Sequence, residues 1–189
     1  MSLNLVHLLR TQARANHLAN RRLHGALAQL AADEFHAPRT SFFPSLALTL
    51  NHILAVDRYY LAALQGDAAM RAQFTEFVPC ETAAALAEAQ VASDLRLVAF
   101  CDALLPDEPA REIVLDRGAR GYHRSPLAHI CQHLFMHQTH HRGQAHAMFS
   151  GTTVAPPPLD DFLLPCDAAD HAADLVAVGW TSAQLFPGV

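Results

Sequence analysis

The sequence has few charged residues and no concentrated basic segment. Charged residues make up 16% of its 189 positions, whereas hydrophobic residues make up 51%. This composition lets burial offset chain entropy and excludes a disordered protein. Thirteen Lys plus Arg against eighteen Asp plus Glu give a net charge of -5, and no basic run could follow a phosphate backbone. We therefore expect one globular domain that has no nucleic acid partner.

Signals for export, membrane insertion and disulfide bonding are also missing. Residues 1–22 contain no basic region followed by an apolar stretch and a small-residue cleavage site. No run of about 18 uninterrupted apolar residues indicates a membrane span. There is no CxxC pair, and the cysteines are too scattered to indicate a disulfide framework or a thiolate metal site: Cys80, Cys101, Cys131 and Cys166. These absences favour a cytoplasmic protein that does not enter a membrane.

Apolar residues recur at helical spacing in four long segments. Pro38 and Pro44 mark a connection that is long for a helical bundle, and Pro106 ends the third segment. Ser125 followed by Pro126 is a typical helix opening, because Ser caps free amides and Pro suits the first turn. The sequence thus predicts an all-α fold. Its four long helices are expected over residues 4–33, 45–64, 81–105 and 125–150.

The segment between the third and fourth predicted helices has a different pattern. Residues 111–115 form a short β-capable run, and Gly118 and Gly121 follow it. Glycines placed after such a run are typical of a turn. We therefore expect a small extended excursion or a hairpin at this point of the chain.

The C-terminal part of the chain begins with a break at residues 156–158, which are three prolines. Helical patterns then resume over 168–178 and 180–186, and they predict one or two short helices packed on the bundle. We therefore expect a bundle formed by residues 1–158 and an extension formed by residues 159–189, within a single domain overall.

Histidine is the most unusual feature of the composition. The thirteen histidines equal the whole Lys plus Arg count, and six of them lie between residues 129 and 146. At about 100° per residue, His137 and His141 share the apolar face of the fourth predicted helix, while His129, His133 and His140 fall towards its edge. Histidines four residues apart on one face have Cβ atoms about 5–6 Å apart and can bind one ion.

A third histidine, His52, interrupts the apolar stripe of the second predicted helix, which includes Leu48, Val56 and Tyr59. Buried alone, it would most simply be a hydrogen-bonded core residue, and an HxxxH pair also arises by chance in a chain this rich in histidine. If the three histidines converge, however, they repel one another when protonated and leave lone pairs unsatisfied when neutral. A bound divalent cation resolves both problems. The absence of an HExxH motif excludes the usual metallopeptidase site.

Three short motifs occur in order along the chain: NHLANRRL (Asn16–Leu23), SLALTLNHILAVDRYYLAALQG (Ser45–Gly66) and HLFMHQTHHRGQAHAMFSG (His133–Gly151). Together they span most of residues 4–158, and the set resembles the DinB-like family of helical-bundle metalloproteins, of the DinB/YfiT type. The resemblance implies a four-helix bundle with a long crossover connection, often assembled as a homodimer. It also implies a divalent metal ion, zinc or nickel among others, on His52, His137 and His141.

The resemblance also bears on chemistry. Relatives in the wider superfamily include thiol-dependent transferases and a mycothiol-dependent maleylpyruvate isomerase. This implies that the ion activates a low-molecular-weight thiol for transfer to a small-molecule substrate or for its isomerisation. Gln144, one turn beyond His141, is a candidate to hydrogen-bond a ligand imidazole or the substrate. Tyr59, two turns from His52, is a candidate to line the pocket, or equally a core residue. Arg142 faces away from the metal, which favours helix packing, a dimer contact or a rim salt bridge.

Two other functions stay open at this point. A hydrolase would use a water held by the ion and an acidic base, but Asp57, the carboxylate nearest His52 in sequence, lies at about 140° from it around the helix. A non-catalytic metal-binding stress protein would use the ion mainly to stabilise the bundle. A fourth protein ligand would indicate such a structural site, whereas an open position would allow catalysis.

Overall fold

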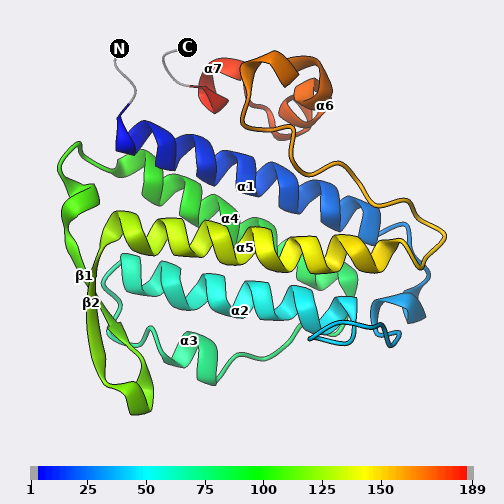
Figure 1. Ribbon diagram of the computed structural model, residues 1–189, viewed down its shortest axis with the longest axis horizontal. Coiled ribbons are helices and arrows are strands. Elements are labelled where there is room, and N and C mark those ends of the chain that lie inside the picture. Colours follow the sequence, from blue (N-terminus) through cyan, green and yellow to red (C-terminus); the bar gives the residue numbers. More distant parts are fainter. Residues whose placement is uncertain (1–3, 187–189) are drawn as a thin grey trace.

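Four long helices form a bundle in the computed structural model, which describes residues 4–186 (Figure 1). They are α1 (Leu5–Leu27), α2 (Leu46–Leu64), α4 (Ala83–Ala103) and α5 (Leu127–Phe149). Helix α1 packs against α4 and α5, and α2 packs against the same two helices, so α1 and α2 occupy opposite corners. The connection between them, residues 28–45, therefore crosses one end of the bundle. This arrangement confirms the predicted all-α fold and its long crossover. No helix within residues 4–186 is long and apolar enough to span a membrane.

The first helix ends earlier than the predicted residue 33. Helix α1 stops at Leu27, and a 3₁₀ turn, Ala32–Phe35, follows after an extended Ala31 with φ -61° and ψ 147°. The turn buries Phe35 in the same apolar cluster as Leu23 and Leu27. Burial of a Phe side chain contributes about 1.5–3 kcal/mol, more than one further turn of helix would contribute through propensity alone. Helical periodicity does not reveal this competing burial.

The predicted serine cap of the fourth helix is wrong. Ser125 and Pro126 belong to strand β2 (Tyr122–Pro126), and α5 begins at Leu127 without a side-chain cap. The Leu127 N–H donates instead to the carbonyl oxygen of Arg111, at 2.8 Å. The incoming hairpin thus satisfies an amide that a serine hydroxyl was expected to satisfy.

A β-hairpin joins α4 to α5 at the left end of Figure 1, and it confirms the predicted excursion. Strand β1 (Glu112–Asp116) pairs antiparallel with β2, with Ile113 opposite Ser125. The turn between them contains Gly118 and Gly121, whose φ angles of +64° and +76° favour glycine. Ile113 and Leu115 are buried in the main core cluster, so one side of β1 anchors the hairpin to the bundle. A short helix that the sequence did not predict, α3 (Ala72–Thr75), follows α2.

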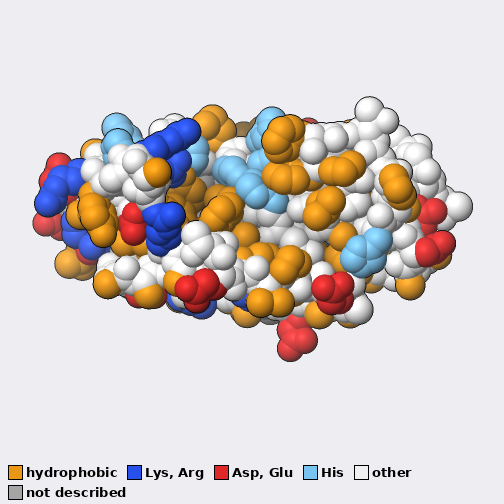
Figure 2. All heavy atoms as spheres, turned by 90° about the horizontal axis from the view of Figure 1, so that it is seen from below, with side chains coloured by type: hydrophobic (Ala, Val, Ile, Leu, Met, Phe, Trp, Pro, Cys, Tyr) orange, Lys and Arg blue, Asp and Glu red, His pale blue; other side chains and the backbone are white. Residues whose placement is uncertain are grey.

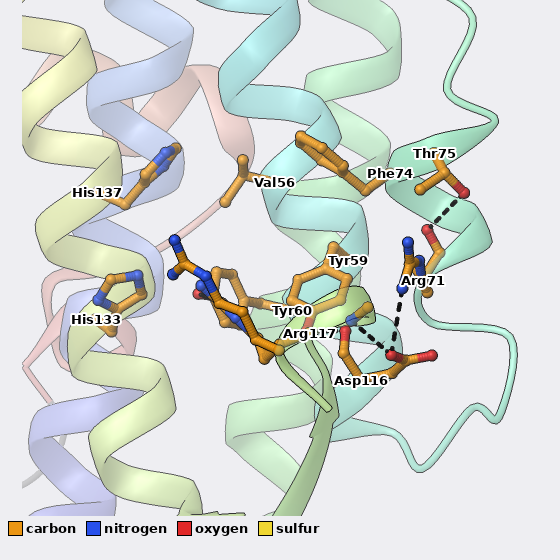
Figure 3. A pocket seen from close by; sticks show the side chains of 12 residues that line it. Val56, Tyr59, Tyr60, Arg71, Phe74, Thr75, Asp116, Arg117, His133 and His137 are labelled. Atoms are coloured by element: carbon orange, nitrogen blue, oxygen red, sulfur yellow. Dashed lines mark hydrogen bonds and ion pairs between the residues drawn. The ribbon is translucent and has the colours of Figure 1, made fainter. Parts of the chain in front are cut away.

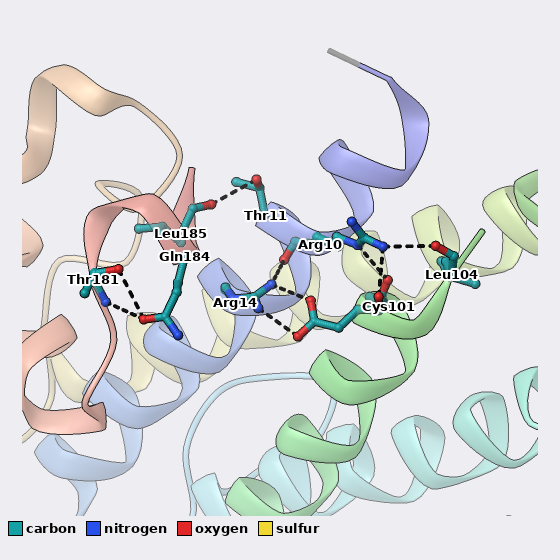
Figure 4. Close-up of polar contacts among 9 residues, drawn as sticks. Arg10, Thr11, Arg14, Cys101, Leu104, Thr181, Gln184 and Leu185 are labelled. Carbon is teal, nitrogen blue, oxygen red and sulfur yellow. Dashed lines mark hydrogen bonds and ion pairs between the residues drawn. The ribbon is translucent and has the colours of Figure 1, made fainter. Parts of the chain in front are cut away.

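The C-terminal segment packs on α1, on the side of the bundle away from α2 (Figure 1). It contains two short helices, α6 (Ala168–Val178) and α7 (Ser182–Leu185), where the sequence predicted one or two. The Thr11 hydroxyl of α1 donates to the carbonyl oxygen of Leu185 at 3.0 Å (Figure 4). The proposed division into residues 1–158 and 159–189 stays a prediction, and its outermost residues, 1–3 and 187–189, lie outside the described part. One apolar cluster joins the two parts: Ala15, Leu18, Ala19, Phe162, Leu175, Leu185 and Phe186.

Two arginines of α1 fasten the C-terminal end of α4 (Figure 4). Arg10 donates to the carbonyl oxygens of Cys101, Asp102 and Leu104 at 2.8–3.2 Å. Arg14 donates to both carboxylate oxygens of Asp102 at 2.8 Å. Because the last carbonyls of a helix lack partners within it, these bonds stabilise the end of α4 as well as its packing.

Candidate metal centre

The three histidines predicted as ligands lie together between α2 and α5. His52 comes from α2, and His137 and His141 come from successive turns of α5. The Nε2 atoms of His52 and His137 are 3.1 Å apart. The ring centroid of His141 lies 4.6 Å from that of His52 and 4.4 Å from that of His137. One nitrogen from each residue lies within 4.8 Å of the others, and within residues 4–186 no fourth His, Cys, Asp or Glu joins the group.

An aromatic side chain that the sequence analysis did not predict packs against one side of the three histidine rings. Phe43, from the crossover, has its ring centroid 4.5 Å from that of His52 and 5.6 Å from that of His141. Sequence reasoning missed Phe43 because a connection rich in proline has no periodicity. The prediction is wrong for Leu48, which lies in the first turn of α2 and is 52% exposed. The apolar stripe is therefore buried at Val56 but opens to solvent before His52.

Burial and mutual repulsion keep the three imidazoles neutral near pH 7. Burial lowers the pKa of His52 to about 4, and the charge that His141 would carry adds to this effect. Burial lowers the pKa of His137 to about 3, with further contributions from His141 and His52. Burial also lowers the pKa of His141, against the opposing hydrogen bond to Gln144. Neutral imidazole is the form that binds a metal ion.

Gln144 determines which nitrogen of His141 is free. Its Oε1 lies 2.8 Å from Nδ1 of His141. An amide oxygen can only accept, so Nδ1 of His141 carries the proton and Nε2 keeps a lone pair. The amide nitrogen of Gln144 lies 3.2 Å from Nε2 of the exposed His140, which holds the amide in this orientation. Hydrogen bonds of this kind commonly fix the tautomer of a metal-binding histidine.

The donor set fits a first-row divalent metal ion. Nitrogen ligands at about 2.0–2.1 Å from a tetrahedral ion lie about 3.3 Å from one another, close to the separation of the His52 and His137 nitrogens. Without a cation, the Nε2 atoms of His52 and His137 face each other, and at most one of the two neutral rings can donate to the other. Imidazole suits zinc, nickel, copper and iron alike. His129 and His133, expected at the edge of α5, are exposed and lie outside the group.

Arg142 points away from the histidines and into the bundle core, as predicted. It donates to Asn20 and Gln138 at 3.1 Å, and also to Asn16. Its contacts with α1 confirm the helix-packing alternative.

Asp57 also lies in the core and not at the histidine group. It accepts hydrogen bonds from Gln90, at 2.8 Å, and from Gln138. Gln90 donates to Asp94 as well, at 2.9 Å. Sequence reasoning missed this buried polar network. Its signal is a set of amide and acidic residues at inward positions of several helices, and only the packing of those helices brings them together.

Tyr59 is a core residue and also lines a cavity, which are the two roles that the sequence analysis left open for it. It is 8% exposed, and its hydroxyl donates to the carbonyl oxygen of Asp116 at 2.9 Å. It also lines a cavity of about 510 Å³ whose wall includes His137. Figure 3 shows Tyr59 and Val56 on the α2 side of this cavity and His137 on the α5 side.

One protein family matches most of the chain. The match covers residues 1–168, which include the four bundle helices, the hairpin and all three clustered histidines. Comparison with curated proteins gave no match. Because the family model covers far more than half of the sequence, the chain belongs to the DinB family.

Proposed function

We propose that His52, His137 and His141 hold one divalent metal ion, zinc or nickel, and that the protein is a metal-dependent enzyme. One observation carries this proposal. Three neutral imidazoles from two helices converge, and no fourth residue of a metal-binding type joins them within residues 4–186. Structural sites are usually closed by a fourth protein ligand, whereas catalytic sites keep a position open. Membership of the DinB family is compatible with this function.

The ion, when bound, would lower the pKa of a low-molecular-weight thiol at the open position and so make the thiol nucleophilic at neutral pH. The side chains around the site support this chemistry. Gln144 holds the tautomer of His141, and Phe43 keeps water from one side of the rings. The cavity beside His137 has the size of a small-molecule site. We propose that a substrate bound there accepts the thiol or is isomerised by it.

The residues around the site give hydrolysis less support. Asp57 is held in the core by Gln90 and Gln138. Asp116 lines the cavity, but one of its oxygens accepts from the Gly118 N–H and lies 3.6 Å from Arg71. Neither carboxylate is placed as a free general base. A purely structural metal role is disfavoured because residues 4–186 place no fourth ligand at the group.

We also propose that the protein works as a homodimer in the cytoplasm. All four cysteines are free, which suits a reducing compartment. Two-fold dimers are the commonest assembly of soluble proteins. Light scattering on the metal-loaded protein should give twice the mass of the chain, and a monomer mass over the working concentration range would contradict the proposal.

The metal site is tested by measuring metal content per chain on untagged protein with plasma mass spectrometry. We expect about one first-row ion in the wild type and a loss of roughly 10-fold or more in His52→Ala, His137→Ala or His141→Ala, because two imidazoles bind far more weakly than three. The matched controls are His129→Ala and His133→Ala, which remove exposed histidines of the same helix. Equal loss of metal from the controls, or a wild type that cannot be loaded, would overturn the proposal.

The thiol is tested separately on protein loaded with cobalt(II). Addition of cysteine or glutathione should produce a sulfur-to-cobalt charge-transfer band in the near ultraviolet, because the open position accepts the thiolate. The band should be missing from the His141→Ala protein. A loaded wild type that binds neither thiol would contradict the thiol chemistry while leaving the metal site intact.

A further inference from the structure

The cavity beside His137 is lined from four parts of the chain: α2, the segment with α3, the hairpin and α5. Its volume of about 510 Å³ lies within the range of about 300–1,000 Å³ typical of small-molecule sites. Figure 3 shows its side chains, with Val56, Tyr59 and Phe74 on one side and His133 and His137 on the other. A molecule held here would therefore lie next to one of the proposed metal ligands.

One end of this cavity is strongly basic. Arg71, Arg117 and Arg120 line it, and Asp116 is the one carboxylate among its lining residues. The excess of positive charge contrasts with the net charge of -5 of the whole chain. The chain contains no lysine, so every fixed cation is a guanidinium, and guanidinium binds planar carboxylates through two parallel hydrogen bonds. Figure 2 shows basic side chains gathered at the hairpin end of this face, beside histidine side chains.

Two of the three arginines have no anionic partner in the described part of the chain. Arg71 lies 3.6 Å from Asp116 and is partly neutralised. Arg117 donates to the hydroxyl of Tyr60 at 3.0 Å and forms no ion pair. For the side chain of Arg120, residues 4–186 provide neither a hydrogen bond nor an ion pair. Arg117 and Arg120 are thus available to an anion from solution.

The hairpin turn explains why these two arginines act together. Arg117 directly precedes a 3₁₀ turn, Gly118–Arg120, and Arg120 is its last residue; side chains three residues apart eclipse one another in such a turn. Glycine suits position 118 because its φ of +64° lies in the left-handed region, and a Cβ there would displace the flexible guanidinium of Arg71. Four amides of the turn donate within it: those of Arg117, Gly118, Arg120 and Gly121 donate to oxygens of Gly121, Asp116, Arg117 and Gly118, respectively. The turn therefore offers guanidinium groups and no backbone cradle of the kind that phosphates favour.

We propose that this cavity binds a small organic acid, with its carboxylate on Arg117 and Arg120 and its apolar body against Tyr59, Val56 and Phe74. The inference names the substrate class of the proposed enzyme and in that sense rests on the proposed function. The binding itself depends on the arginines, not on the metal. With the acid group held at the hairpin, the opposite end of the molecule faces His137, where the thiol chemistry would take place.

The test measures binding of 3-phenylpropionate by calorimetry, with the neutral 3-phenylpropanamide as the matched probe. The acid should bind and the amide should not, and the affinity should fall as salt is raised. Arg120→Gln and the double variant Arg117→Gln, Arg120→Gln should each weaken binding by about 10-fold or more. The Arg120 side chain forms no hydrogen bond or ion pair within residues 4–186, so we expect its variant to keep the fold and to isolate recognition.

Two control variants and two metal states complete the experiment. Arg111→Gln and Arg124→Gln alter hairpin arginines that pair with Glu108 and Glu112 outside the cavity, and they should leave the affinity unchanged. Each measurement is made on metal-loaded and chelator-treated protein. Binding that needs the arginines in both states supports the inference even if the metal chemistry fails. Binding of the acid that survives Arg120→Gln, or that vanishes on removal of the metal, would overturn the inference. Tighter binding of phenyl phosphate than of the acid would also overturn it.

Discussion

At the scale of single residues, Asp57 belongs to a buried network of charged and amide side chains that favours its protonated form. Asp57, Asp94 and Arg142 are all buried and connected through Gln90 and Gln138. Burial, followed by the negative charge of Asp94, raises the pKa of Asp57 to about 8. Protonation of Asp57 avoids a second buried negative charge next to Asp94, which lies 3.3 Å from Nδ1 of His17. A core of this kind avoids an uncompensated buried charge.

A pH dependence of stability follows from Asp57. Its pKa is higher in the folded state than in the unfolded state, so its favourable contribution is complete below about pH 4 and is lost as the pH rises to about 8. Between these pH values, ionisation of Asp57 lowers the free energy of unfolding by up to about 1.4 kcal/mol for each rise of one pH unit. In Asp57→Asn this slope should disappear. Urea denaturation of both proteins from pH 5 to pH 8 measures the difference.

The comparison with Asp57→Asn is needed because His24 changes the stability with pH in the opposite direction. Burial lowers the pKa of His24 to about 4, so its contribution to stability is lost as the pH falls through the acid range. Wild type and Asp57→Asn share this effect, and subtraction cancels it. Parallel pH profiles for the two proteins would show that Asp57 is ionised in the folded state.

At the scale of elements, the C-terminal extension is held on α1 by one arginine as well as by its apolar cluster. Arg22 donates to Asp174 at 2.7 and 2.9 Å and to both carboxylate oxygens of Asp161 at 2.8 Å. Its guanidinium lies 4.3 Å from the ring centroid of Phe162. It also donates to the carbonyl oxygens of Pro158 and Asp170. One side chain thus joins α1 to the loop before α6 and to α6 itself.

Removal of this side chain should loosen the extension. We expect Arg22→Ala to lower the free energy of unfolding by about 1–3 kcal/mol, because several charge-assisted hydrogen bonds are lost. Cleavage by a protease within residues 152–167 should become faster. Arg21→Ala is the matched control, since Arg21 is exposed and should change stability by less than about 0.5 kcal/mol. Unchanged cleavage in Arg22→Ala would mean that the apolar cluster alone holds the extension.

The sequence predicted those features that depend on one helix at a time. The spacing of His137 and His141 follows from the helical period, and so does the outward direction of His133. The meeting of His52 with the two histidines of the other helix was expected from the family resemblance, but several other features that depend on two elements meeting were missed. The Leu127 amide bonded to Arg111 replaced the expected serine cap, and Phe43 reaches the histidines from a connection without periodicity. The arginine-lined end of the cavity was missed for the same reason, since Arg71 and the hairpin turn are distant in sequence.

At the scale of the whole molecule, the metal should stabilise the fold. The three histidines come from α2 and α5, which lie far apart in sequence, so the unfolded chain does not hold them together. A ligand that binds only the folded state at about 100 times its Kd adds about 2.7 kcal/mol of stability. For a domain of this size the Tm should rise by roughly 5–10 °C.

Thermal unfolding with and without a chelator measures this effect. The wild type and His133→Ala should lose the same increment of Tm when the metal is removed, whereas His137→Ala should begin at the lower value and should not respond. Equal Tm values for loaded and chelated wild type would show that the ion does not discriminate between the folded and unfolded chain.

The three histidines and the two hairpin arginines lie on parts of the fold that differ in their importance for stability, and this has an evolutionary consequence. His52, His137 and His141 lie on helices whose other faces form the core, so substitutions near them put the fold at risk. Arg117 and Arg120 lie at an exposed turn that contributes little to that core, and changes at such turns usually cost little stability. Under the proposed function, descendants of this chain could therefore bind different small molecules by exchanging a few residues of the turn, while the three histidines are inherited unchanged.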